Sequence, residues 1–173
     1  MAAVSNVMRS FLFGVLCIAG LSLAGCSGGT PGSIDVSGTR TMQVDRGYAL
    51  SSVNALRARN GLQPLRYSAT LDQASERQAK AMAARNKMSH SLEGRLSARV
   101  SQYGYNWGSI AENIGYGYRD TPAAMQGWIN SAGHKKNILN PRVTEMGFGM
   151  AMGPNNIPYW AMIFGTENKM RLR

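Results

Sequence analysis

Residues 145–165 read EMGFGMAMGPNNIPYWAMIFG, and this stretch decides the fold class. Two runs rich in apolar and aromatic residues, 145–152 and 159–165, flank the turn-forming residues 153–156. Such runs on either side of a turn predict an antiparallel β-hairpin. Residues 110–116 predict a third strand, although their glycines lower the strand propensity.

Helices are expected upstream of this hairpin, over 48–60, 68–87, 96–103 and a segment beginning at Thr121. Ser68 is a suitable N-terminal cap for the second helix, and Thr121 followed by Pro122 is a suitable start for the fourth. Helices followed by a terminal antiparallel sheet predict an α+β domain in which the helices cover the sheet.

The N-terminal segment is typical of a bacterial lipoprotein signal peptide. Arg9 precedes an apolar run at 11–23, which is too short to span a bilayer as a stable helix. The run ends in Leu23-Ala24-Gly25-Cys26, which resembles the lipobox where a diacylglyceryl group is attached to cysteine before cleavage. The predicted parts are a signal peptide at 1–25, a lipidated Cys26 with a flexible linker at 26–46, and one domain at 47–173.

Export and charge together limit the class of partner. The chain has 19 basic and 9 acidic residues, a formal net charge of +10, which in a cytosolic protein would suggest nucleic acid. An exported protein instead meets anionic lipid head groups, lipopolysaccharide or peptidoglycan, so we expect no nucleic acid as partner. A solvated basic surface without a dedicated partner is the alternative. Ser27 after the lipidated cysteine resembles lipoproteins of the outer membrane in Gram-negative cells.

Three residues are candidates for chemistry. The chain has two histidines, His90 and His134, and each is predicted at a helix end or in a loop. Glu112 lies in an otherwise apolar segment, where a charge needs a partner. Two imidazoles and a carboxylate can bind zinc or another divalent cation, or can orient a water with histidine as base. The alternative is that Glu112 bridges loops and the histidines are ordinary surface residues.

Seven motifs follow one another along the chain: VNALRARNGL at 53–62, MSH at 88–90, AENIG at 111–115, WINSAGHKKNIL at 128–139, EMGFG at 145–149, YW at 159–160 and FG at 164–165. In this order they resemble the bacterial form of the CAP superfamily, also called the SCP or pathogenesis-related-1 family. The resemblance covers about residues 48–166 and implies a three-layer α-β-α sandwich with a mostly antiparallel central sheet. It also implies a cleft with two histidines and two acids, which binds zinc or another divalent cation in some members.

Carried over by position, the resemblance assigns His90, Glu112 and His134 to the cleft. The second acid of the family pattern stands three residues after the tryptophan that corresponds to Trp128, and here that position is Ser131. Water or the Ser131 hydroxyl would fill the place, and a weaker metal site is expected. Glu145 either approaches the cleft as a substitute or has a surface role.

Three functions are compatible with these residues. We favour a binding or interaction module of the envelope, because the second acid is lost at Ser131 and no nucleophile motif is recognised. The first alternative is a metal-dependent hydrolase of peptides or envelope polymers, with Glu112 or a histidine as base. The second is a lipid-binding protein, which would require an apolar groove. Whether the protein is an enzyme stays open.

Overall fold

A computed structural model describes residues 33–168 of the chain. The predicted signal peptide, the lipidation of Cys26 and the first part of the linker lie outside these residues. Within the described part, no helix has the length and apolar character needed to cross a membrane.

The centre of the domain is a five-stranded sheet in the order β1-β4-β5-β3, with β2 paired to β4. Only the β2–β4 pair is parallel, and the pairs β1–β4, β4–β5 and β3–β5 are antiparallel. The predicted hairpin is confirmed as β4 and β5, and the predicted third strand is β3. The strands are β1 (Arg40–Thr41), β2 (Arg66–Tyr67), β3 (Trp107–Tyr116), β4 (Glu145–Met152) and β5 (Pro158–Glu167).

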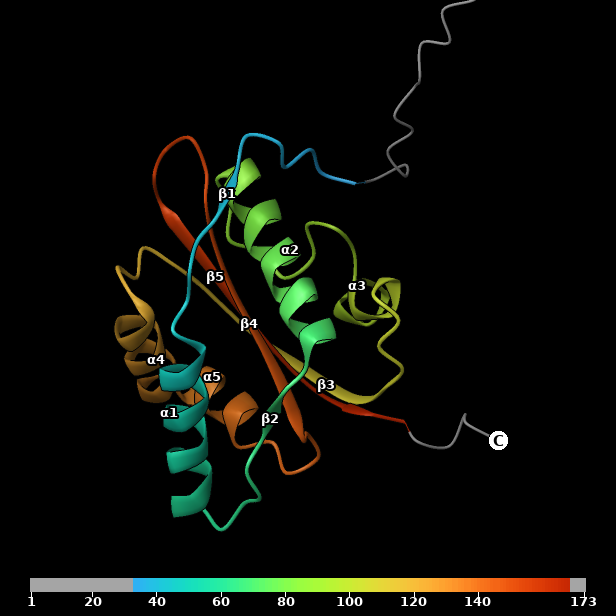
Figure 1. The fold of residues 1–173 in the computed structure, drawn as a ribbon, viewed down its shortest axis with the longest axis vertical. Helices are drawn as coiled ribbons and strands as arrows, with labels where there is room; N and C mark the ends of the chain where they lie inside the picture. Colours follow the sequence, from blue (N-terminus) through green and yellow to red (C-terminus); the bar gives the residue numbers. More distant parts are fainter. Residues whose placement is uncertain (1–32, 169–173) are drawn as a thin grey trace, which may run out of the picture.

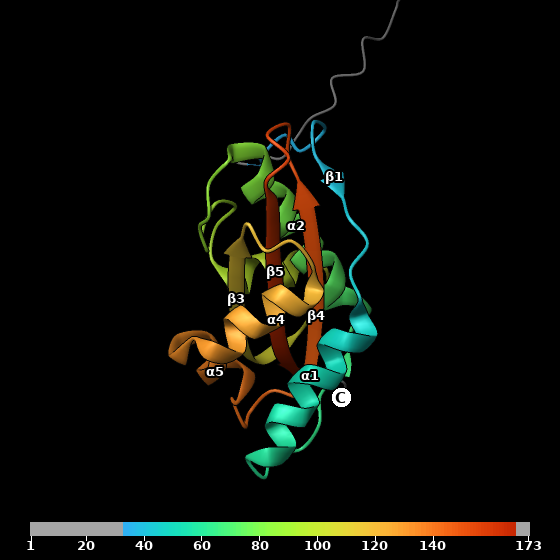
Figure 2. The ribbon, with the colours of Figure 1, turned by 90° about the vertical axis from the view of Figure 1, so that its left-hand side faces the viewer.

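Helices cover both faces of the sheet, which confirms the three-layer α-β-α sandwich (Figures 1 and 2). One layer contains α1 (Arg46–Arg59), α4 (Thr121–Asn130) and α5 (Ala132–Ile138). The other contains α2 (Ala69–Arg85) and α3 (Leu96–Gln102).

Buried side chains from both faces of the sheet form the core. Phe148, Trp160 and Met162 pack with Trp128 toward the layer of α1, α4 and α5. On the opposite face, α2 lies directly against β4, because Gly147 has no side chain to hold it away. A Cβ at Gly147 would come within 2.0 Å of the backbone of α2.

Two predicted boundaries are wrong near α4. Asp120, not Thr121, caps this helix by accepting a hydrogen bond from the backbone N–H of Ala123 at 2.8 Å. The segment after α4 contains a further short helix, α5, which the sequence did not predict, so His134, expected at a helix end or in a loop, lies in the first turn of this helix. This helix was not predicted because it has only seven residues and includes Gly133, so it shows no repeating pattern of apolar residues.

Residues 33–46 belong to the folded domain, which corrects the expectation of a flexible linker there. Arg40 and Thr41 pair with the end of β4, and Ile34 and Val44 are buried. The segment carries few apolar residues, so its local sequence resembles a linker. Its order comes from strand pairing with distant residues.

Strand β3 lies at the edge of the sheet and positions the candidate site. Its outer edge is covered at two carbonyls. Asn137 Nδ2 donates a hydrogen bond to the Glu112 carbonyl at 3.0 Å, and Trp128 Nε1 donates to the Ile114 carbonyl at 3.3 Å. Side chains from α4 and α5 thus occupy acceptors that could otherwise pair with another strand.

Candidate functional site

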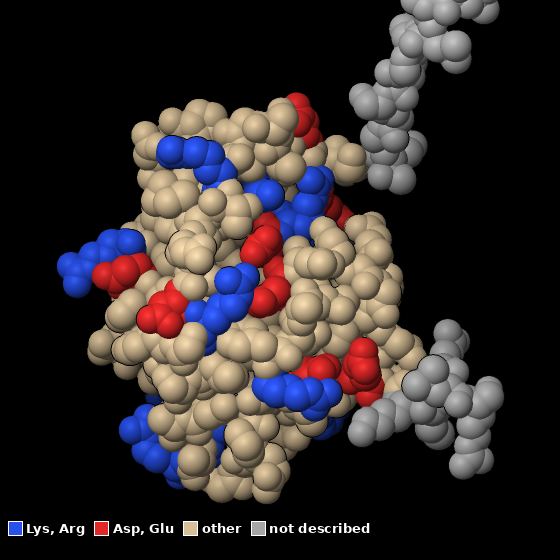
Figure 3. Space-filling model, viewed as in Figure 1, with Lys and Arg blue, Asp and Glu red and all other residues tan. Residues whose placement is uncertain are grey.

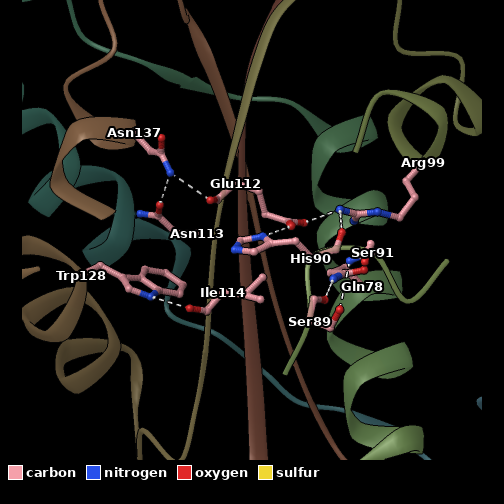
Figure 4. A network of polar contacts seen from close by, with 10 residues as sticks. All are labelled: Gln78, Ser89, His90, Ser91, Arg99, Glu112, Asn113, Ile114, Trp128 and Asn137. Atoms are coloured by element: carbon pink, nitrogen blue, oxygen red, sulfur yellow. Dashed lines mark hydrogen bonds and ion pairs between the residues drawn. The ribbon is translucent and has the colours of Figure 1, made fainter. Parts of the chain in front are cut away.

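His90, Glu112 and Arg99 form a hydrogen-bonded group at this edge (Figure 4). His90 Nδ1 lies 2.7 Å from Glu112 Oε2, and Arg99 Nη2 lies 2.9 Å from Glu112 Oε1. The side chains of Glu112 and Arg99 are 3% and 4% exposed, whereas that of His90 is 61% exposed. A buried ion pair therefore supports an imidazole that faces solvent.

The pair with Arg99 determines what Glu112 can do. Its negative charge is balanced by the guanidinium, and each of its oxygens already accepts a hydrogen bond. An ionised carboxylate can only accept, so His90 Nδ1 carries the proton in this contact. When the ring is neutral, its Nε2 is the acceptor available to a ligand.

The loop that carries His90 is held from both of its flanking helices. Gln78 Nε2 on α2 donates to the Ser89 carbonyl at 2.7 Å. Arg99 Nη2 on α3 donates to the His90 carbonyl at 3.1 Å as well as to Glu112. The loop starts at Asn86, which adopts the left-handed conformation with φ of 47°. These bonds fix the imidazole by its backbone and by its ring.

His134 approaches the same edge from the opposite layer. Asn113 Nδ2 on β3 donates to the His134 carbonyl at 3.1 Å, and the ring lies 6.2 Å from the Trp128 ring, centroid to centroid. Burial, followed by the nearby charge of His90, lowers the pKa of His134. Its Nδ1 atom is buried and has no hydrogen-bond partner in the described residues. His134 is consequently neutral at pH 7.

The other two candidates from the sequence do not join this group. Ser131 is the N-cap residue of α5, but its side chain makes no capping hydrogen bond. Glu145 lies at the start of β4, where its carboxylate accepts a hydrogen bond from Tyr105 at 2.5 Å and pairs with Arg66 at 2.6 Å. Strand β5 separates β4 from β3, so Glu145 supports the sheet and does not substitute for the missing acid.

Sequence reasoning missed Arg99, which controls the charge of the site. Arg99 lies beside Val100 in a short helix, and both are buried. The need of Glu112 for a partner was a usable signal, but it does not identify which of the 19 basic residues meets the need.

The three-ligand metal site expected from His90, Glu112 and His134 does not fit this arrangement. The Glu112 side chain is 3% exposed, and its oxygens lie against His90 Nδ1 and Arg99 Nη2, so it supports the histidine and does not face an open position for a metal. Within residues 33–168, no three His, Cys, Asp or Glu side chains are placed to hold a metal ion. The chemistry present is an oriented, exposed imidazole beside a neutral, partly buried one.

A basic cavity of about 610 Å³ is lined in part by Ile110 and Ala111, the two residues of β3 that precede Glu112. Lys136 and Arg142 supply its positive charge, and no acidic residue lines it. Asn137 connects it to the group described above, because this residue lines the cavity and also bonds to the Glu112 carbonyl.

Comparisons with known proteins agree with this architecture. The chain is 33% identical over 103 residues to the protein named "Uncharacterized membrane protein YlbC" of Bacillus subtilis strain 168. The match covers 58% of this chain and spans only 30% of the length of that relative.

Two solved structures share the fold. An extracellular SCP-domain protein of Bacillus anthracis strain Ames superposes with a TM-score of 0.64 at 28% identity, covering 70% of this chain and 40% of that one. An outer surface protein of Borrelia burgdorferi superposes with a TM-score of 0.67 at 19% identity, covering 75% and 98% respectively.

The model of the cysteine-rich secretory protein family, CAP, matches residues 50–164. The match includes all five helices except the first residues of α1, and it contains His90, Glu112 and His134. The chain therefore belongs to the CAP family.

Proposed function

We propose that this protein is a lipid-anchored binding module of the bacterial cell envelope. In this proposal the β3 edge around His90 and His134 holds a carboxylate-bearing envelope polymer, peptidoglycan. The observation that carries the proposal is the state of Glu112, whose two oxygens are bound by Arg99 and His90. A general base must reach the proton that it removes, and the Glu112 side chain is only 3% exposed and is held by Arg99 and His90.

No other group at the edge, among the described residues, supplies a nucleophile in its place. The Ser89 hydroxyl accepts a hydrogen bond from the Ser91 N–H at 3.3 Å within its own loop. A serine nucleophile requires a hydrogen bond from its hydroxyl to the histidine that activates it, and in the described residues the Ser89 hydroxyl makes none to His90. The exposed His90 ring is suited to hydrogen bonding with a ligand.

Charge supports an anionic ligand. Lys136 and Arg142 line the cavity that Asn137 connects to the Glu112 carbonyl, and no acid is in its lining. Many acidic side chains elsewhere lie against basic ones, as the face in Figure 3 shows. The ion pairs are Arg46 with Asp72 and Glu76, Arg66 with Glu145, Arg77 with Glu93, Arg99 with Glu112, and Arg119 with Asp120.

The anchor in this proposal is lipid on Cys26. The supports are the lipobox-like residues 23–26 and the relatives named as a membrane protein, an extracellular protein and an outer surface protein. Replacing Cys26 by Ala should move the protein from the membrane fraction to the soluble fraction of producing cells. Retention of Cys26→Ala in the membrane fraction would contradict the anchor.

The binding proposal is tested by co-sedimentation of the full chain, purified in detergent, with isolated peptidoglycan sacculi. We expect saturable binding that is weakened in Lys136→Ala/Arg142→Ala and in His90→Ala/His134→Ala. Arg85→Ala, which removes an exposed charge from the end of α2, is the matched control and should bind normally. Circular dichroism verifies that each variant is folded.

The same assay separates the competing functions. Vesicles of anionic phospholipid and micelles of lipopolysaccharide replace the sacculi in parallel samples, and the supernatant is analysed for released fragments with zinc and with chelator. Binding to vesicles alone would move the proposal to lipid head groups. Zinc-dependent release of fragments that is lost in the histidine variant would replace the binding module with a metal-dependent hydrolase.

A further inference from the structure

A second groove lies at the other end of the same strand. Large apolar side chains that are exposed in the described residues include Met88 at 47% and Tyr116 at 56%. Both line one groove of about 450 Å³, a volume in the usual range of small-molecule sites. Two exposed apolar side chains in one concave surface indicate a binding site more strongly than the same side chains scattered singly.

The floor of this groove is a rigid aromatic surface. Tyr116 on β3 and Tyr159 on β5 are paired across the sheet, and their rings stack with centroids 6.1 Å apart at 23°. Tyr159 is buried and donates a hydrogen bond from its hydroxyl to Asn86 Oδ1 at 2.7 Å. Asn155 Nδ2 donates to the same oxygen. The Tyr116 ring therefore rests on a fixed support.

The groove also has a defined charge. Lys87 lines it, together with Asn86 and Ile157, and no acidic residue is in its lining. The flat face of an aromatic ring is electronegative and attracts the polarised C–H groups of a sugar. A stacked tyrosine beside a lysine thus fits a pyranose ring that carries a carboxylate.

The position of the groove connects it to the histidine site. Met88 is two residues before His90, and Tyr116 is four residues after Glu112 on β3, which corresponds to roughly 13 Å along the strand. A ligand that fills the groove would have to extend along β3 toward Glu112 to reach the imidazole. The aromatic groove, the histidines and the basic cavity follow one another along β3.

We propose that the Met88–Tyr116 groove is a saccharide subsite that takes the pyranose ring of a carboxylate-bearing N-acetylhexosamine glycan. This inference rests on the proposed function, because it names the sugar part of the polymer that the histidine site holds. Tyr116 provides the stacking surface, and Lys87 provides the contact with the carboxylate. An acyl chain is the competing occupant, and its binding is an outcome of the test.

The test is calorimetric titration of the full chain in detergent with the disaccharide of N-acetylglucosamine and N-acetylmuramic acid. Chitobiose, which lacks the carboxylate, and palmitate are titrated in parallel. We expect the carboxylated disaccharide to bind best and Tyr116→Ala to weaken it about ten-fold or more, with Tyr116→Phe close to the unaltered protein. Lys87→Ala should remove the preference over chitobiose. Tyr48→Ala, which removes another exposed tyrosine, is the matched control.

The outcomes distinguish this inference from the proposed function. Disaccharide binding that is absent, or that is equal in the protein and in Tyr116→Ala, overturns the saccharide subsite, and palmitate binding lost in Tyr116→Ala overturns it in favour of an acyl site. Sedimentation with sacculi that still depends on His90 and Lys136 would then leave the proposed function standing. The opposite result is disaccharide binding that depends on Tyr116 together with sedimentation that does not depend on His90. It would support the saccharide subsite and refute the histidine binding site.

Discussion

Two buried arginines in this domain make different kinds of contact. Arg57 on α1 donates hydrogen bonds only to backbone carbonyls, and no acidic side chain is paired with it in the described residues. Burial lowers its pKa, but the ordinary pKa of a guanidinium is so far above neutrality that the side chain stays charged at pH 7. The acceptors are the carbonyls of Gln63 at 2.8 Å, Ile138 at 2.8 Å, Asn140 at 2.9 Å and Val143 at 3.4 Å.

Arg99 on α3 has a less complete set of partners. Its Nη2 atom donates hydrogen bonds to Glu112 and to the His90 carbonyl. Its Nε and Nη1 atoms are buried and have no hydrogen-bond partner in the described residues. Arg57 thus fixes the end of α5, whose helix dipole favours a cation there, and Arg99 balances a charge at the candidate site. One arginine therefore supports the position of His134 by geometry, and the other supports His90 by charge.

The largest effect is expected from Arg57→Ala. The change leaves the carbonyls of three chain segments without their donor, and the contacts to Ile138 and Val143 are buried, so the free energy of unfolding should fall by about 3–5 kcal/mol. Urea denaturation followed by circular dichroism measures this. Arg59→Ala on the exposed end of α1 is the control and should change stability by less than about 0.5 kcal/mol. A loss below about 1 kcal/mol in Arg57→Ala would show that the carbonyl contacts do not hold α5.

A double-mutant cycle at Arg99 and Glu112 tests the claim that charge matters at the second arginine. Arg99→Met and Glu112→Gln should each cost about 2–3 kcal/mol, because each leaves one buried group without its charged partner. The loss of unfolding free energy in the double variant should be smaller than the sum of the two single losses by at least about 1 kcal/mol. The same denaturation experiment gives all values. Additive losses would mean that the two side chains are not coupled, and the contrast with Arg57 would then disappear.

Lysine substitutions separate the two roles, because lysine keeps the positive charge but lacks the planar guanidinium group. Arg57→Lys should cost about 2 kcal/mol, since an ammonium group cannot reach carbonyls on several sides at once. Arg99→Lys should cost about 1 kcal/mol, since the main requirement there is a positive charge near Glu112. Equal losses for the two variants would argue against the division between geometry and charge.

The smallest effect is expected at His134. Because its pKa is lowered in the folded protein, folding favours the neutral ring. That contribution is fully present above the unfolded value near 6.5 and is lost as pH falls below it, so acid destabilises the fold. When the pH falls from about 7.5 to about 5, the free energy of unfolding should decrease less in His134→Gln than in the unaltered protein. The urea midpoints at both pH values measure this, and identical decreases in the two proteins would refute it.

Local sequence was sufficient for most of the architecture. Apolar and aromatic runs around Gly153-Pro154 give the β4–β5 hairpin, and Ser68 marks the start of α2. These features depend on residues close in the chain, so they can be read without a structure. The motif resemblance likewise identified His90, Glu112 and His134 as residues of one region.

Other features depend on contacts between distant segments. Arg40 and Thr41 form β1 only because Met152 and Ala151 of β4 are available to pair with them. The seven residues of α5 are stabilised by packing and by Arg57, which is 81 residues before Ile138. Neither contact produces a pattern in the local sequence from which it could be predicted.

At the candidate site, the residues that carry chemistry could be identified from the sequence, namely two histidines and one acid among apolar neighbours. Their chemical roles depend on contacts that form only in the folded chain. The tertiary structure pairs Glu112 with Arg99, turns His90 toward solvent and leaves Ser131 and Glu145 outside the group. The physical reason is that a buried carboxylate must be paired with a cation. Which cation lies close enough to Glu112 depends on how α3 packs against β3.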